Sequence, residues 1–181
     1  MSSPKNARKG ALRSRRQALA LIGSALLAAP LASACQPLYG TTQNGTRLKD
    51  VMAGIDITPI PGRVGQRLRN ELIFTTTGGG YPGESRYRLE ISVRESLTKT
   101  LVSTTGDAQG EIFLLEARYK LISLADNKVV LEGKGVGRAA YDRFNPIFAN
   151  VRARIDAENR AARTVAETIR TGVAGYLSGQ A

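Results

Sequence analysis

The fold is decided by one stretch of alternating residues, Arg86-Tyr87-Arg88-Leu89-Glu90-Ile91-Ser92-Val93-Arg94. Tyr87, Leu89, Ile91 and Val93 share one side of this stretch, and polar or charged residues occupy the other. Side chains of a β-strand point alternately to the two faces of a sheet. The stretch therefore predicts a strand over residues 86–97 that is buried on one face and solvated on the other.

Two later segments repeat this alternation, and turn residues separate the three. Residues 111–124 place five apolar residues on one face: Phe113, Leu115, Ala117, Tyr119 and Leu121. Residues 128–141 predict a third strand whose inward face holds Val129, Leu131, Gly133, Gly135 and Gly137. Glycines weaken a strand because they have no side chain to pack. We therefore expect these three glycines to allow a helix to approach the sheet closely, or to mark a bulge. A hairpin loop over residues 98–109 and a turn at 125–128 predict an antiparallel meander.

Two segments have apolar residues at three- and four-residue steps, which predicts amphipathic helices. Residues 63–76 carry the stripe Val64, Leu68, Leu72 and Ile73. Residues 147–178 carry the stripe Phe148, Val151, Ile155, Ala162, Val165, Ile169, Val173 and Tyr176. With a short strand at Ile55–Thr58, these segments predict an α+β fold, namely a two-layer sandwich. Its mostly antiparallel four-stranded sheet has two helices packed on one face.

The first 34 residues predict a lipoprotein signal peptide. Residues 1–17 hold six basic residues and no acidic residue, and residues 18–29 are apolar but too short for the about 20 residues that span a bilayer. Leu31-Ala32-Ser33-Ala34 then leads to Cys35, the sole cysteine. Small residues at this place are typical of signal-peptide cleavage. We therefore expect lipidation of Cys35, with N-acyl diacylglycerol as the anchor; a buried cysteine after an ordinary signal peptide is the alternative.

The chain after the signal peptide divides into two parts. Residues 35–50 predict a lipidated N-terminus and a polar tether, and residues 51–181 predict one folded domain. The leader favours the general secretory route, although Ser14-Arg15-Arg16-Gln17 also resembles a twin-arginine signal.

Composition argues against several classes of function. There is no histidine, the commonest general base and metal ligand, and no phosphate loop, nucleophile motif or paired-cysteine motif. We therefore expect no enzyme activity, no metal and no cofactor besides the acyl groups. The 26 basic residues include the six of the leader, so the remaining chain has 20 basic and 15 acidic residues, a charge of +5. Much of the basic signal is thus leader, and we expect no nucleic-acid partner.

The face of the sheet that the helices leave uncovered is predicted to be basic. It holds Arg86, Arg88, Arg94, Arg118, Lys120, Lys134 and Arg138 against Glu90, Glu116 and Glu132. Cross-strand ion pairs, each worth about 0.2–1 kcal/mol, explain part of this pattern on a solvated face. The surplus of basic residues suits phosphate groups. A carboxylate pair among the three glutamates, for hydrolytic acid–base chemistry, is a further alternative, but ion pairing with the arginines explains them more simply.

The segment Cys35-Gln36-Pro37-Leu38-Tyr39-Gly40, followed by strand, helix, three strands and a long helix, resembles the LptE family of lipopolysaccharide-assembly lipoproteins in its alphaproteobacterial form. The resemblance implies a protein lipid-anchored in the cell outer membrane, at its periplasmic face. It implies a partnership with the LptD β-barrel in placing lipopolysaccharide in the outer leaflet. It also implies that basic sheet residues bind lipopolysaccharide, and the candidates are Arg86, Arg88, Lys120 and Lys134.

A second hypothesis is an envelope adaptor lipoprotein, facing the periplasm, that binds another protein or peptidoglycan. The basic face is then merely solvated. Lipopolysaccharide binding that persists after reversal of Arg86, Arg88 and Lys134 to Glu would favour this adaptor.

Overall fold

The computed structural model describes residues 40, 42, 45–102, 108–143 and 146–179. The predicted signal peptide and Cys35 lie outside the described residues. The described elements are, in chain order, α2 (Leu48–Ala53), β1 (Ile55–Ile57), α3 (Gly62–Thr77), β2 (Tyr87–Val102), β3 (Ala108–Ser123), β4 (Lys128–Asp142) and α4 (Ile147–Leu177). No helix within these ranges combines the length and the apolar character needed to cross a membrane.

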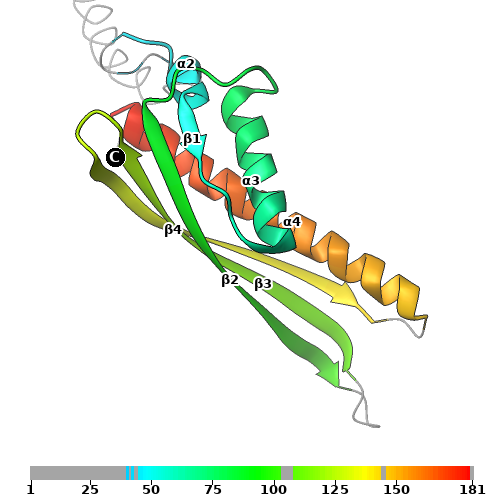
Figure 1. The fold of residues 1–181 in the computed structure, drawn as a ribbon. Coiled ribbons are helices and arrows are strands. Elements are labelled where there is room, and N and C mark those ends of the chain that lie inside the picture. The colour runs from blue at the N-terminus through cyan, green and yellow to red at the C-terminus, as the bar shows by residue number, and fades with distance from the viewer. Residues whose placement is uncertain (1–39, 41, 43–44, 103–107, 144–145, 180–181) are drawn as a thin grey trace, which may run out of the picture. The chain divides into compact units, whose positions relative to one another are not determined.

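The strands form one mixed sheet in the order β1-β2-β3-β4. β2, β3 and β4 are an antiparallel meander, and the three residues of β1 run parallel to the start of β2. The helices cover one face of this sheet, and the other face is open (Figure 1). The predicted α+β two-layer sandwich is thus confirmed, with a third, short helix added.

The core fills the space between the sheet and the helices. The inward faces predicted for β2 and β3 and the apolar stripe predicted for α3 are confirmed. The largest fully buried side chains come from β2, β3, α3 and α4: Leu89, Phe113, Leu115, Leu121, Leu68, Leu72, Val165, Val173 and Ile169. Burial of each such side chain stabilises the fold by about 1.5–3 kcal/mol.

The glycines of β4 let α4 approach the sheet closely, as predicted. A Cβ atom at Gly137 would overlap the carbonyl of Ala161 on α4, and one at Gly133 would overlap the ring of Tyr119. The hydroxyl of Tyr119 also fills the space beside Gly172 of α4. Tyr119 thus occupies volume that glycines on both neighbouring elements leave vacant.

The inward position predicted for Val129 is wrong. The pairing of β3 with β4 shifts between Leu121 and Ile122, which lie opposite Leu131 and Val129. Val130 is the extra residue of this bulge, and Val129 is exposed. A bulge changes which face the preceding residues occupy, because it adds one residue to a period of two.

The burial predicted for the start of the long helix is also wrong. Phe148 is 77% exposed and Val151 is 49% exposed. The start of α3 lies beside the second quarter of α4, since Arg63 of α3 forms an ion pair with Glu158. The first turns of α4 therefore have no α3 beside them. Farther along α4, the predicted stripe is buried at Ala162, Val165, Ile169 and Val173, and Tyr176 is partly buried.

Two boundaries differ from the sequence prediction. α2 is not predicted at all, yet it buries Leu48, Val51 and Met52, so the folded region extends into the predicted tether. A helix of six residues is too short to show a repeating apolar pattern. β2 continues to Val102 and β3 begins at Ala108, so most of the predicted hairpin loop is paired strand.

Candidate functional site

The register of the sheet arranges the side chains of its open face in rows across β2, β3 and β4. One row contains Glu90, Lys120 and Glu132, and the next contains Ser92, Arg118 and Lys134. A third row contains Arg94, Glu116 and Val136. The basic residues predicted for this face thus lie on adjacent strands.

Ion pairs neutralise the first row. Lys120 Nζ lies 3.0 Å from Glu132 Oε1, and Arg88 Nε lies 3.2 Å from Glu90 Oε1. These pairs are exposed and contribute about 0–1 kcal/mol each. Lys120 lies between Glu90 and Glu132 in the register, and Glu116 is two rows away. Lys120 thus separates Glu90 from Glu132 in this row, and both of these carboxylates form ion pairs with basic residues.

The second row is different, because Arg118 lies directly opposite Lys134. Like charges directly opposite one another on neighbouring strands destabilise a sheet. Within the described part of the chain, neither residue has a carboxylate within ion-pair distance. An anion bound over this row would offset their repulsion.

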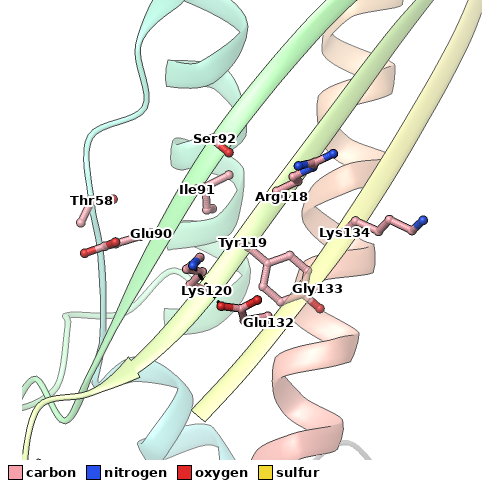
Figure 2. Close-up of a pocket in the computed structure, with 10 residues that line it drawn as sticks. All are labelled: Thr58, Glu90, Ile91, Ser92, Arg118, Tyr119, Lys120, Glu132, Gly133 and Lys134. Carbon is pink, nitrogen blue, oxygen red and sulfur yellow. Dashed lines mark ion pairs between the residues drawn. The ribbon is translucent and has the colours of Figure 1, made fainter. Parts of the chain in front are cut away.

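An open hollow of ≈ 970 Å³ lies on this part of the sheet (Figure 2). Its charged lining residues are three basic and two acidic ones, and Lys120 turns toward Glu132. The complete lining is Thr58, Glu90, Ile91, Ser92, Arg118, Tyr119, Lys120, Glu132, Gly133 and Lys134. Burial raises the pKa of Tyr119 above its ordinary value of 10.0. We call this hollow, with Arg118 and Lys134, the basic hollow.

The four lipopolysaccharide-binding candidates are divided by the structure. Lys120 and Lys134 line the basic hollow, whereas Arg86 and Arg88 do not. Arg86 precedes β2, where its backbone N–H donates to the Gly54 carbonyl at 2.9 Å and its carbonyl accepts from Leu124 at 3.0 Å.

Arg118 belongs to the hollow although it is not among the four candidates. Its position opposite Lys134 depends on the register of β3 with β4. The turn at residues 124–127, with Asn127 in the left-handed region, is the sequence signal for this hairpin. The bulge at Leu121/Ile122, which lies between the turn and Arg118, completes the register.

The chemistry of the hollow suits anion binding. A guanidinium donates paired hydrogen bonds to phosphate or carboxylate, and an ammonium acts as a point charge. Among the described residues, no group of His, Cys, Asp and Glu side chains could hold a metal ion.

No protein-family model matches this chain, and no curated protein matches it in sequence. Solved structures are similar in fold. A candidate lipoprotein from Caulobacter crescentus CB15 has a TM-score of 0.61 and 21% identity, covering 73% of this chain and 96% of that one. Rare lipoprotein B from Shewanella oneidensis and a minor lipoprotein from Acinetobacter baumannii each have a TM-score of 0.51 and 10% identity. Each covers 68% of this chain, and 93% and 92% of the respective neighbour. At such identities the likeness shows a shared fold.

Proposed function

We propose that this chain is an LptE-type lipoprotein of the outer membrane, anchored at the periplasmic face through acylated Cys35. It partners an LptD-like β-barrel and binds lipopolysaccharide through the basic hollow. The fold supports the proposal, because one structure that shares it is rare lipoprotein B, which is LptE. The signal-peptide pattern and the segment Cys35–Gly40 support the anchor.

One observation carries the lipopolysaccharide-binding proposal, the unneutralised pair of Arg118 and Lys134 on an open sheet face. The lipid A part of lipopolysaccharide carries phosphate groups. A phosphate above this row accepts hydrogen bonds from the Arg118 guanidinium and interacts with the Lys134 ammonium. Binding then removes a repulsion that is present in the unliganded sheet, which favours the bound state.

The experiment that tests this proposal reverses both charges. We expect Arg118→Glu with Lys134→Glu to weaken binding of purified lipopolysaccharide to the full chain by at least about tenfold, since each lost charge-assisted contact contributes about 1.5–3 kcal/mol. The matched control is Arg152→Glu with Arg163→Glu, which makes the same change in net charge on exposed positions of α4. An equal loss in both double variants would mean that net charge, not the basic hollow, controls binding.

The anchor and the partner have separate tests. Mass spectrometry of the mature N-terminus is expected to find acylated Cys35 as the first residue. Mild-detergent purification from membranes is expected to retain a large β-barrel protein. A mature chain that begins elsewhere contradicts the anchor, and a preparation without a barrel protein contradicts the partnership. The role proposed here is binding and assembly, without catalysis.

A second candidate is the envelope adaptor, and the exposed start of α4 favours it. Ile147 and Phe148 are 82% and 77% exposed, beside Val151. Contiguous exposed apolar side chains are typical of protein–protein contact surfaces. Two results together would support the adaptor. The native chain does not bind lipopolysaccharide but co-purifies with a protein that is not a β-barrel, and Phe148→Asp abolishes that co-purification.

A further inference from the structure

A second hollow lies in the helix layer, where α2, the C-terminal end of α3 and the last two turns of α4 come together (Figure 1). It measures ≈ 220 Å³, and side chains from all three helices line it, among them Lys49 of α2 and Arg170 of α4. The basic hollow lies on the open face of the sheet, and the two linings share no residue. We call the second one, with Lys49 and Arg170, the helix-end hollow.

The helix-end hollow holds two positive charges. Lys49 is exposed, and its Cε atom lies 3.8 Å from the place that a Cβ atom at Gly78 would occupy, so this side chain lies along the end of α3. Arg170 is half-buried. Within the described ranges, neither side chain forms a hydrogen bond or an ion pair. Partial burial removes water from the guanidinium, and a bound anion would replace the lost hydrogen bonds.

Negative charge on the same three helices offsets little of this positive charge. Asp50 of α2 and Glu71 of α3 each form an ion pair with a neighbouring arginine at 2.9 Å. Glu167 precedes Arg170 by about one turn of α4, and the two form no ion pair in the described part of the chain. The C-terminal end of a helix carries a partial charge of about −0.5. The end of α3 therefore balances only part of the two positive charges at the hollow.

The rest of the lining is partly apolar. Leu48, Met52 and Ala174 are buried lining residues. Thr75 and Thr76 also line the hollow, but their hydroxyls donate to backbone carbonyls of α3 at 2.9 and 2.8 Å, so the side-chain donors for a ligand are the two basic residues. Pockets for drug-sized ligands measure about 300–1,000 Å³. The smaller helix-end hollow suits one phosphate group with the carbon atoms attached to it.

The helix-end hollow lies at the end of the domain that the proposed anchor joins. The Leu48 N–H donates to the Gly40 carbonyl at 3.0 Å, so the chain enters the domain beside α2. Gly40 follows Cys35 by five residues, and a fully extended segment of this length spans at most about 18 Å. With Cys35 acylated, as proposed above, lipid headgroups are within reach of this end of the domain.

We propose that the helix-end hollow binds the phosphate of an anionic phospholipid from the leaflet that holds the Cys35 acyl chains. The Arg170 guanidinium donates paired hydrogen bonds to this phosphate, and the Lys49 ammonium acts as a point charge. The acyl chains attach the protein at one point, so this second contact fixes the orientation of the domain on the membrane. The proposal rests on the anchor proposed above, but on neither lipopolysaccharide binding nor a barrel partner.

Native mass spectrometry of the mature chain, purified in a neutral detergent, tests this proposal. The probes are phosphatidylglycerol, which is anionic, and phosphatidylcholine, whose phosphate is balanced by choline. We expect the native chain to bind phosphatidylglycerol at least about tenfold more tightly, since two basic residues contact the anionic headgroup. Lys49→Glu with Arg170→Glu is expected to abolish this preference. The charge control, Arg152→Glu with Arg163→Glu on exposed positions of α4, is expected to keep it.

Further variants separate this site from the others. Lys49→Gln with Arg170→Gln adds no negative charge and is also expected to lose the preference, with a thermal unfolding midpoint close to that of the native chain. Arg118→Glu with Lys134→Glu is expected to keep the preference, because those residues line the basic hollow. The masses in the same spectra report acylation, so a failed anchor is distinguished from a failed headgroup site.

Four results would each overturn the proposal. The first is equal affinity of the native chain for the two lipids, and the second is an equal loss of preference in the charge control. The third is displacement of phosphatidylglycerol by inorganic phosphate at an equal concentration, which would mean that the hollow binds a soluble anion. The fourth is the loss of a co-purified protein, but not of phosphatidylglycerol, in Lys49→Glu with Arg170→Glu, which would mean that the hollow binds acidic side chains.

Discussion

The backbone of Gly137 on β4 lies so close to the Ala161 carbonyl of α4 that no Cβ atom fits between them. Gly137→Ala is therefore expected to destabilise the fold by about 1–3 kcal/mol, because the helix must move away from the sheet. Gly175→Ala is the matched control, since a Cβ there meets no atom within 4 Å. That change is expected to stabilise α4 by about 0.5–1 kcal/mol. Urea denaturation measures the unfolding free energy of each variant. Equal unfolding free energies for Gly137→Ala and Gly175→Ala would contradict the close approach of α4 to β4.

Glu158 is a buried carboxylate that joins α3 to α4. It accepts a hydrogen bond from Arg154 Nε at 2.9 Å and forms an ion pair with Arg63 of α3. Glu158→Gln is expected to lower the free energy of unfolding by about 1–3 kcal/mol, because charge-assisted bonds at a buried site are lost.

The control for this change is an exposed ion pair on the same helix. Asp156 accepts from Arg160 Nε at 2.8 Å, and both side chains are largely solvated. Asp156→Asn is expected to change stability by less than about 0.5 kcal/mol. A Glu158→Gln variant as stable as Asp156→Asn would show that the α3–α4 contact does not depend on this carboxylate.

The stability of the fold is expected to fall in the alkaline range because of Tyr141. Burial, together with its hydrogen bond to Glu111, raises the pKa of Tyr141 from 10.0 to about 12. The folded state thus prefers the neutral phenol. This contribution, at most about 2–3 kcal/mol, is fully present below pH 10 and is lost as the pH rises to 12.

Tyr141→Phe isolates this effect from the titration of other groups. The native chain is expected to exceed the variant in unfolding free energy below pH 10, and the difference is expected to shrink between pH 10 and 12. Urea denaturation at several pH values measures it. A difference that stays constant across this range would contradict the assigned role of the Tyr141–Glu111 hydrogen bond.

The exposed start of α4 gives a contrast between two phenylalanines. Phe148→Ala is expected to change the unfolding free energy by less than about 0.5 kcal/mol, since this ring is 77% exposed. Phe113→Ala is expected to cost about 3–5 kcal/mol, because Phe113 is fully buried between sheet and helices. Thermal unfolding followed by circular dichroism distinguishes them. A large loss with Phe148→Ala would mean that the helix start is packed.

The sequence predicted the parts of the fold that depend on local periodicity. Alternation around Leu89 and around Leu115 was enough to place two strands and their inward faces. It could not predict the bulge at Val130, which depends on how two strands pair. It also could not distinguish Phe148 from Val165, since both continue one helical stripe and differ only in what lies beside them.

The candidate site was predictable as a face but not as a set of contacts. Alternation placed Lys120 and Lys134 on the open face, and the structure places both at the basic hollow. The pairing of Lys120 with Glu132, and the opposition of Arg118 and Lys134, follow from register and side-chain conformation. The apolar and polar alternation of a single strand contains no information about either the register or the side-chain conformation.

If Arg118 and Lys134 bind phosphate, then binding of lipid A must depend on its phosphate groups. Binding of the full chain to lipid A with both phosphates is to be compared with binding to the same lipid after enzymatic removal of the phosphates. We expect at least about tenfold weaker binding of the dephosphorylated lipid to the native chain, and little difference between the two lipids for Arg118→Glu with Lys134→Glu. Equal affinity of the native chain for the two lipids would contradict the proposal that the basic hollow recognises phosphate.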